Sequence, residues 1–178
     1  MQRALLIVDM LNDFIRSNGA LPVPGSEKII SPLKDLLEAF RKKGEPVIYV
    51  CDFHRHDDEE FGVWGPHAVM GSWGSKIIDE LEPLNEEIII YKRRFSGFFG
   101  TDLDLTLREK RVEEVVVTGV LTNICVLYTA SDAYQRGYKV VVPADCVAAA
   151  DPEMHRFALK QLKEVVGARI VDSYKEII

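Results

Sequence analysis

The sequence has few cysteines and no pattern that would pair them. Only three of its 178 residues are cysteine, at positions 51, 125 and 146. An odd number of widely spaced cysteines argues against a disulfide framework and leaves at least one free thiol. The fold is therefore expected to depend on a hydrophobic core, for which 47% of the residues are suited.

Long apolar runs and clusters of positive charge are also missing. No apolar segment approaches the roughly 20 residues that a membrane span needs. Residues 1–9 are too short for a secretory signal. No run of Lys and Arg is longer than three, and a formal charge of -6 argues against a nucleic-acid surface. We therefore expect a soluble protein of the cytoplasm with no nucleic-acid or membrane partner.

Short apolar runs that alternate with helical patterns are abundant. Runs this rich in Val and Ile are typical of strands buried on both faces of a parallel sheet. Their alternation with helices predicts an α/β fold, a doubly wound, six-stranded, mostly parallel sheet with helices on both faces, in one domain over residues 1–178. The expected strands are residues 4–10, 46–51, 87–91, 113–119, 138–143 and 168–172.

Four helices are expected between these strands. One follows Ser26 as N-cap and ends at Gly44, and another is capped by Thr101 and runs through Lys110. The last two cover residues 122–136 and 152–166. Residues 52–86 form a long irregular insertion, and insertions of that length in compact domains are usually functional.

Reactive side chains follow several of the expected strands. In open α/β sheets, ligands bind beyond the carboxyl ends of the strands, where the strand order reverses. A carboxylate, an ammonium group and a thiol are therefore expected to meet at one edge. The residues concerned are Asp9, Asp52, His54, Lys92, Cys125, Asp145 and Cys146.

Cys125 is expected in the first helical turn after a strand. Unpaired N–H groups there carry positive partial charge, lower the pKa of a thiol and can receive an oxyanion. Lys92 would add a positive charge, and Asp9 could move the thiol proton to a leaving amine. Each residue also has a purely structural alternative: Cys125 as a buried apolar residue, Asp9 as the cap of a turn, and Lys92 as a solvated cation. Because all three residues follow strands and should meet at one edge, a catalytic role is favoured over these alternatives.

The insertion also carries a candidate metal site. Asp52 and His54 lie on one side of an extended segment, and His67 would complete a set of two histidines and a carboxylate. Such a set suits Zn²⁺, Fe²⁺ or Mn²⁺ with open coordination positions. The alternative is a solvated acidic loop. Further candidate ligands in the loop are His56, Glu59 and Glu60.

Together these segments resemble the isochorismatase-like cysteine hydrolase family over essentially the whole chain. The resemblance implies a parallel-sheet α/β fold and a catalytic triad of Asp9, Lys92 and Cys125. It also implies a cis peptide between Val120 and Leu121, with the N–H groups of Leu121 and Cys125 as the oxyanion hole. The matching segments are "LLIVDMLNDF", "DFH", "WGPHAVMGSWGS", "KRRFSGFFGTDLDLTLR" and "VVVTGVLTNICVLYTASDAYQRGYKVVVPADCVAA".

Within that family, the metal pattern resembles the nicotinamidase/pyrazinamidase-like branch. There a divalent ion anchors the pyridine nitrogen of nicotinamide. For this chain the expected ion is zinc, with iron or manganese as the alternatives. The resemblance therefore implies a metal-binding set and two aromatic, substrate-binding pocket walls. These are Asp52, His54, His67 and Glu60 for the metal, and Phe14 and Trp64 for the pocket.

One departure leaves the substrate open. Nicotinamidases usually have Ala-Thr-Asp-Tyr-Cys where this chain has Leu-Thr-Asn-Ile-Cys at residues 121–125. The sequence of this segment is closer to that of relatives that act on carbamoyl compounds. The presence of Cys125 argues against ether hydrolysis.

The leading hypothesis is a metal-dependent cysteine amidohydrolase that converts nicotinamide to nicotinate and ammonia through a thioester. Either Asp9 or the metal would activate the water that cleaves it. A second hypothesis is a carbamoyl or ureido substrate whose carboxylate binds Arg93 or Arg94. A third is a binding domain without turnover, although no G-x-G-x-x-G loop follows the first strand. Since relatives are commonly dimers or tetramers, a homo-oligomer is expected.

Overall fold

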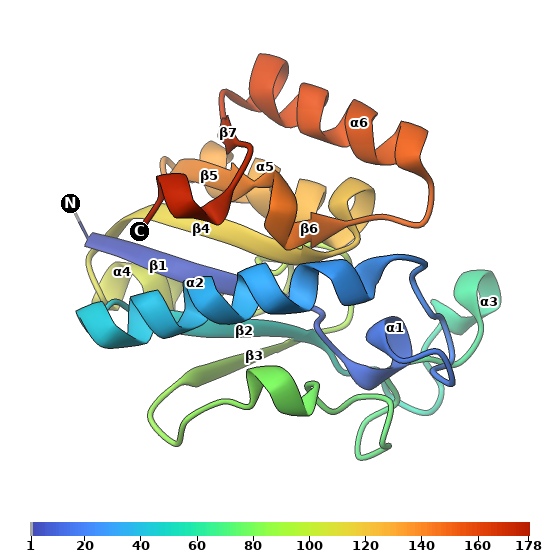
Figure 1. Cartoon of the computed structure of the whole chain (residues 1–178). Coiled ribbons are helices and arrows are strands. Elements are labelled where there is room, and N and C mark those ends of the chain that lie inside the picture. The colour runs from blue at the N-terminus through green and yellow to red at the C-terminus, as the bar shows by residue number, and fades with distance from the viewer. Residues whose placement is uncertain (1) are drawn as a thin grey trace.

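The computed structural model describes residues 2–178, which form a parallel sheet with helices on both faces (Figure 1). The strand order is β3-β2-β1-β4-β5-β7, with the short β6 paired to β4, and every pairing is parallel. The predicted fold class is confirmed, with β6 as an addition too short to give a strand pattern. The strands are β1 (Gln2–Val8), β2 (Val47–Asp52), β3 (Ile88–Lys92), β4 (Val112–Val120), β5 (Lys139–Pro143), β6 (Val147–Ala148) and β7 (Arg169–Val171).

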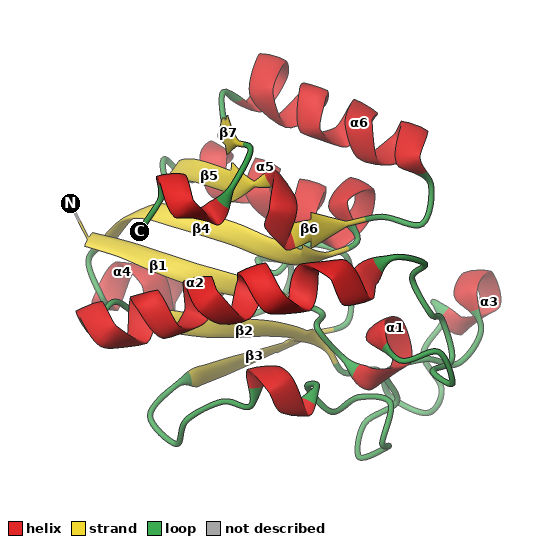
Figure 2. Ribbon diagram, in the orientation of Figure 1, coloured by secondary structure: helices red, strands yellow, loops and turns green. Residues whose placement is uncertain are grey.

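Helices cover the sheet on two sides, so that strand residues alternate between two cores (Figure 2). In β1, Leu5 and Ile7 face the core under α2, whereas Leu6 and Val8 face the core under α4 and α5. This two-sided burial is why the strands are continuously apolar. The helices are α1 (Asn12–Ile15), α2 (Ile30–Lys43), α3 (Phe61–Trp64), α4 (Leu103–Glu109), α5 (Leu127–Gln135) and α6 (Pro152–Gln161).

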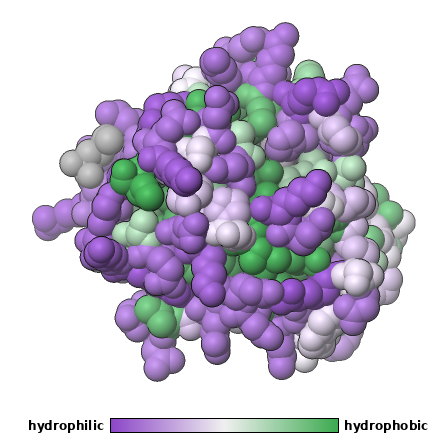
Figure 3. All heavy atoms as spheres, viewed as in Figure 1, coloured by the Kyte–Doolittle hydropathy of each residue, from purple (hydrophilic) through white to green (hydrophobic). Residues whose placement is uncertain are grey.

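Most charged residues lie on the outer surface. Figure 3 shows hydrophilic side chains over most of the face in view, with apolar side chains visible between them. No helix within residues 2–178 is long and apolar enough to cross a membrane.

Helix ends agree with the sequence in part. Gly44 ends α2 with a left-handed φ of 66° and donates its N–H to the Arg41 carbonyl, as predicted. The Ser26 prediction is wrong, because a 3₁₀ turn over Ser26–Ile29 precedes α2 and the buried Ser26 hydroxyl makes no hydrogen bond. The Thr101 hydroxyl does accept the N–H of Leu103, at 3.3 Å, but the helix itself begins at Leu103.

Two predicted helices each contain a change of winding. A π-helical turn over Thr122–Val126 precedes α5, and another over Leu162–Val166 follows α6. An apolar period near 3.6 residues does not distinguish α from π winding over a single turn, so the sequence predicted one helix in each place.

The chain order places the switch point of the sheet beside β1. The chain runs from β1 to β2 and β3 on one side, and then crosses to β4 on the other side of β1. Asp9 directly follows β1, Asp52 and Lys92 end β2 and β3, and Cys125 follows β4. All four residues therefore lie at the carboxyl edge of the sheet, where ligands bind in such folds.

Candidate active site

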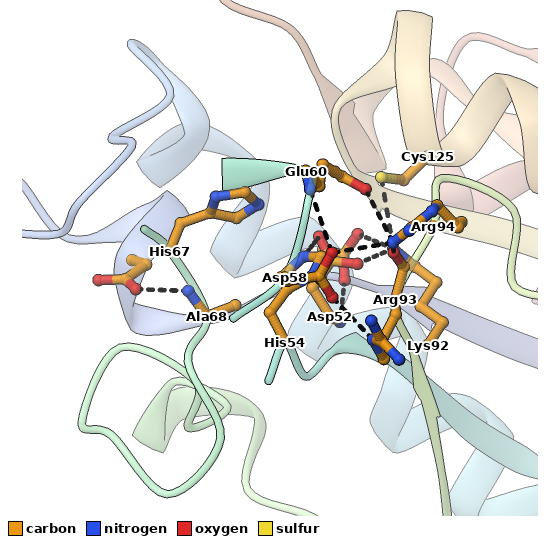
Figure 4. Close-up of polar contacts among 12 residues, drawn as sticks. Asp52, His54, Asp58, Glu60, His67, Ala68, Lys92, Arg93, Arg94 and Cys125 are labelled. Carbon is orange, nitrogen blue, oxygen red and sulfur yellow. Dashed lines mark hydrogen bonds and ion pairs between the residues drawn. The ribbon is translucent and has the colours of Figure 1, made fainter. Parts of the chain in front are cut away.

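Lys92 is the centre of a buried polar cluster (Figure 4). It is 1% exposed, and its Nζ lies 2.8 Å from Asp9 Oδ2, 2.5 Å from Asp52 Oδ1 and 3.4 Å from Cys125 Sγ. The β2–β3 register pairs Asp52 with Lys92, which explains why these two side chains meet. The structure thus brings together the three predicted catalytic groups, and the alternative of a solvated Lys92 is excluded.

The charges in this cluster set one another's pKa values. Burial alone would lower the pKa of Lys92, but the charges of Asp52 and Asp9 outweigh it and hold that pKa well above its usual value. Burial, and then the charge of Asp52, raise the pKa of Asp9 to about 6, although Lys92 opposes both. Lys92 is therefore a fixed cation, whereas Asp9 can accept and release a proton near neutral pH.

The backbone holds Asp9 in place. Its φ of 51° lies in the left-handed region, and its Oδ1 accepts the Asp52 N–H at 2.7 Å, which leaves Oδ2 for Lys92. The neighbouring strand can approach only because residue 119 is glycine. A Cβ on Gly119 would lie 1.9 Å from the Val8 carbonyl oxygen. The close contact between β1 and β4 therefore helps to fix the position of Asp9.

Cys125 lies in the π-helical turn rather than in the first turn of an α-helix. The Val120–Leu121 peptide before it is cis, and the Leu121 carbonyl accepts the N–H groups of Ile124 and Val126 at 3.0 and 3.2 Å. Cys125 is 6% exposed and lines a cavity, so its sulfur is not sealed in the core.

The predicted lowering of the Cys125 pKa is wrong. Burial raises the pKa of the thiol well above its usual value; Lys92 lowers it, but the charges of Asp9 and Asp52 raise it again. With two carboxylates against one ammonium, the cluster already has excess negative charge before the sulfur ionises. The resting protein therefore holds a thiol, and the proton must leave as the sulfur attacks.

A cavity of about 280 Å³ opens onto this cluster. None of the described residues that line it is a lysine or an arginine. Some residues that line the cavity were not predicted from the sequence, because apolar loop residues give no chemical signal. They are residues 20–23, Phe95, Ile124 and Ala150. The predicted residues on its wall are Asp9, Phe14, Asp52, Glu60, Trp64, His67, Val120, Leu121 and Cys125.

Three of the predicted metal ligands also come together. Asp52, His54 and His67 offer ligand atoms that all lie within 4.8 Å of one another. His54 Nε2 is buried without a hydrogen-bond partner and lies 3.7 Å from Asp52 Oδ2. Because the Nδ1 atoms of His54 and His67 are engaged by Asp58 and the Gly65 carbonyl, both Nε2 atoms are left for a metal. The residues fit a divalent ion such as zinc.

A second group of possible ligands does not need a metal. Asp9, Asp52 and Cys125 also offer atoms within 4.8 Å of one another. The Lys92 ammonium contacts all three and so supplies the positive charge there.

The remaining candidates do not join the three-residue metal-ligand set. Glu60 lines the cavity but is outside the three-residue ligand set, and its carboxylate lies 3.7 Å from Arg94 Nη1. Its role as a fourth ligand stays a prediction. Arg93 and Arg94 both bind Asp58 and do not line the cavity, which weakens their assignment as carboxylate binders. His56 is exposed.

Comparison with known proteins agrees with this geometry. The isochorismatase-domain family model matches residues 3–173. The chain belongs to the isochorismatase family. It is therefore an isochorismatase-family hydrolase with the Asp, Lys and Cys groups of the predicted triad in contact.

Three solved structures of the family are similar over nearly the whole chain. Nicotinamidase/pyrazinamidase PncA from Bacillus subtilis is 35% identical, with 97% of this chain and 100% of that chain covered and a TM-score of 0.92. N-carbamoylsarcosine amidase from Thermoplasma acidophilum is 40% identical, with 96% and 95% covered and a TM-score of 0.88. Pyrazinamidase of Pyrococcus horikoshii, in complex with zinc, is 34% identical, with 96% and 99% covered and a TM-score of 0.91.

Proposed function

We propose that this protein hydrolyses a small neutral carboxamide, with nicotinamide as the leading candidate, to a carboxylate and ammonia. The contact of Lys92 with both Cys125 and Asp9, at the wall of the cavity, carries the proposal. It joins a nucleophile, a proton acceptor and a fixed cation in one place.

The first half-reaction replaces a C–N bond by a C–S bond. Cys125 Sγ attacks the carboxamide carbon while its proton passes to Asp9. The N–H groups of Leu121 and Cys125 are the proposed donors to the oxyanion. Asp9 then gives the proton to the amide nitrogen, which leaves as ammonia, and the acyl group remains on sulfur as a thioester. Lys92 keeps Asp9 in position and offsets the negative charge that develops on the sulfur.

The second half-reaction restores the thiol. Asp9 takes a proton from a water molecule, the resulting hydroxyl attacks the thioester carbon, and the sulfur leaves with that proton. When bound to Asp52, His54 and His67, a divalent ion would supply a Lewis acid for a ring nitrogen of the substrate. Phe14 and Trp64 would then hold the ring as apolar walls.

The charge of the cavity favours a neutral substrate. Its charged lining residues are Asp9, Asp52 and Glu60, and none of the described lining residues is a lysine or arginine. Without a bound metal, a substrate with its own carboxylate would meet like charges, which costs binding free energy; an ion on Asp52, His54 and His67 would offset part of that cost. A volume of about 280 Å³ lies at the lower end for ligand pockets and so suits a small molecule.

A second candidate is a small carbamoyl amide. The 40% identity to the Thermoplasma acidophilum N-carbamoylsarcosine amidase favours it. The acidic lining and the engagement of Arg93 and Arg94 by Asp58 disfavour a carboxylate-bearing member of that class.

Ammonia release from a panel of amides separates these possibilities. Purified protein would be tested with nicotinamide, pyrazinamide, N-carbamoyl and ureido compounds, with and without added Zn²⁺, Fe²⁺ or Mn²⁺. We expect metal-stimulated release from the two ring amides, loss of release in Cys125→Ala, and retention in the control Cys146→Ala. Preference for carbamoyl compounds without metal supports the second candidate, and no release from any amide refutes both.

A further inference from the structure

Asp58 is a buried carboxylate that no step of the proposed reaction uses. Its side chain is 0% exposed. Oδ2 accepts from His54 Nδ1 at 3.2 Å and from Arg93 Nε at 2.7 Å. Oδ1 accepts from Arg94 Nη1 at 3.0 Å and from the Glu60 N–H at 3.2 Å. Figure 4 shows these contacts converging between the metal-site residues and the two arginines.

The contact with His54 selects one form of the imidazole. A carboxylate that receives two guanidinium groups can only accept hydrogen bonds, so His54 Nδ1 must carry the proton that joins them. In the neutral ring, the lone pair then lies on Nε2, the atom that is buried without a hydrogen-bond partner and faces Asp52. Without Asp58, no acceptor at Nδ1 would favour this tautomer over the one protonated on Nε2.

Asp58 also joins two segments of the site. Arg93 and Arg94 directly follow Lys92 at the end of β3, whereas Asp58 lies in the segment that follows β2. The ion pairs to Asp58 therefore fix the histidine that would bind the metal relative to the strand that carries the catalytic ammonium.

We propose that Asp58 is a positioning residue for the metal site, holding His54 with Nδ1 protonated and Nε2 directed toward Asp52 and His67. The inference rests on the proposed metal-dependent function. Asp58 does not touch substrate, because it acts through His54 and is absent from the described lining of the cavity.

Metal affinity distinguishes this role from that of an ordinary buried ion pair. Glu87 supplies the matched control, because its carboxylate is 7% exposed and binds Arg41 Nε at 2.8 Å, at the start of β3 and thus at the opposite end of the sheet. Removing either carboxylate takes away a buried ion-pair partner of an arginine. Only Asp58 contacts a proposed metal ligand.

Zn²⁺ dissociation constants would be measured by competition with a chelating dye on metal-stripped protein. We expect Asp58→Ala to bind Zn²⁺ about 10- to 100-fold more weakly than wild type. Asp58→Asn should be less affected, since its amide oxygen can still accept from His54, and Glu87→Ala should bind like wild type. Equal losses in Asp58→Ala and Glu87→Ala, or no loss in Asp58→Ala, would overturn the proposal.

A second readout needs no metal and no activity. Nitrogen NMR of the metal-free protein, at a pH where His54 is neutral, should show the Nδ1-protonated tautomer in wild type and a mixture in Asp58→Ala. The same tautomer in both proteins would overturn the proposal. A wild-type protein that binds no stoichiometric Zn²⁺ would instead refute the metal-dependent function itself, and with it any role for Asp58 in metal binding.

Discussion

Replacing Lys92 by methionine removes the ammonium while keeping much of the side-chain volume. In wild type, Lys92 Nζ lies 2.8 Å from Asp9 and 2.5 Å from Asp52, and the three side chains are 0%, 2% and 7% exposed. The variant leaves two buried carboxylates without a cation. Breaking a buried ion pair in this way costs about 3–5 kcal/mol of unfolding free energy.

That cost should appear as a large fall in thermal stability. For a chain of 178 residues, 1 kcal/mol corresponds to about 2–4 °C, so Lys92→Met should lower the Tm by about 6–20 °C in chelator-treated protein. The fall should be smaller at acidic pH. Asp9, whose pKa is already raised to about 6, becomes protonated there and relieves the repulsion.

Two further variants make the measurement decisive. Asp9→Asn in the Lys92→Met background removes one of the two buried carboxylates that have no cation. It should therefore reverse much of the fall in Tm. Lys42→Met, at an exposed position of α2, should change the unfolding free energy by less than about 0.5 kcal/mol. A Lys92→Met protein that melts like wild type at mildly alkaline pH would refute the assignment of Lys92 as the cation that neutralises the cluster.

Other variants test the thiol, the pocket and the metal site. In metal-free protein, iodoacetamide should modify Cys125 slowly at neutral pH and faster as the pH rises, because burial raises the pKa of its thiol. Peptide mass spectrometry would measure the rate of modification, and a rate that does not change with pH would contradict this prediction. Trp64→Ala should raise KM with little change in Tm, since Trp64 is 42% exposed, whereas the buried Phe14→Ala should lose about 3–5 kcal/mol of stability in denaturant titrations. Burial lowers the pKa of His54, but the nearby carboxylates of Asp52 and Asp58 outweigh burial and raise that pKa above its ordinary value. Protons should therefore compete with Zn²⁺ as the pH falls through neutrality, and a Kd unchanged by pH would contradict this.

Much of the site could be predicted because its side chains directly follow buried strands. Asp9 follows β1, and Asp52 and Lys92 end β2 and β3, so the parallel sheet alone brings them to one edge. Local sequence also identified Asp52 and His54, which are two residues apart in an extended segment. His67 was proposed because it would complete a set of two histidines and a carboxylate, and its place beside His54 depends on the loop between them.

The parts that were missed depend on contacts far apart in sequence. Asp58 stands in an acidic segment that looks solvated, yet its arginine partners are 35 and 36 residues away. The raised pKa of Cys125 follows from burial beside Asp9 and Asp52, which a position at the start of a helix does not reveal. Helix starts therefore predict the direction of a thiol pKa only when the charges around it are known.

The measurement that bears most directly on the account is the mass of the protein during turnover. Protein mixed with nicotinamide and metal, then quenched in acid within the first turnover, should carry one nicotinoyl group, and peptide mapping should place it on Cys125. Hydroxylamine should remove it, as expected of a thioester. Full ammonia release by Cys125→Ala, or an acyl group on another residue, would contradict the mechanism.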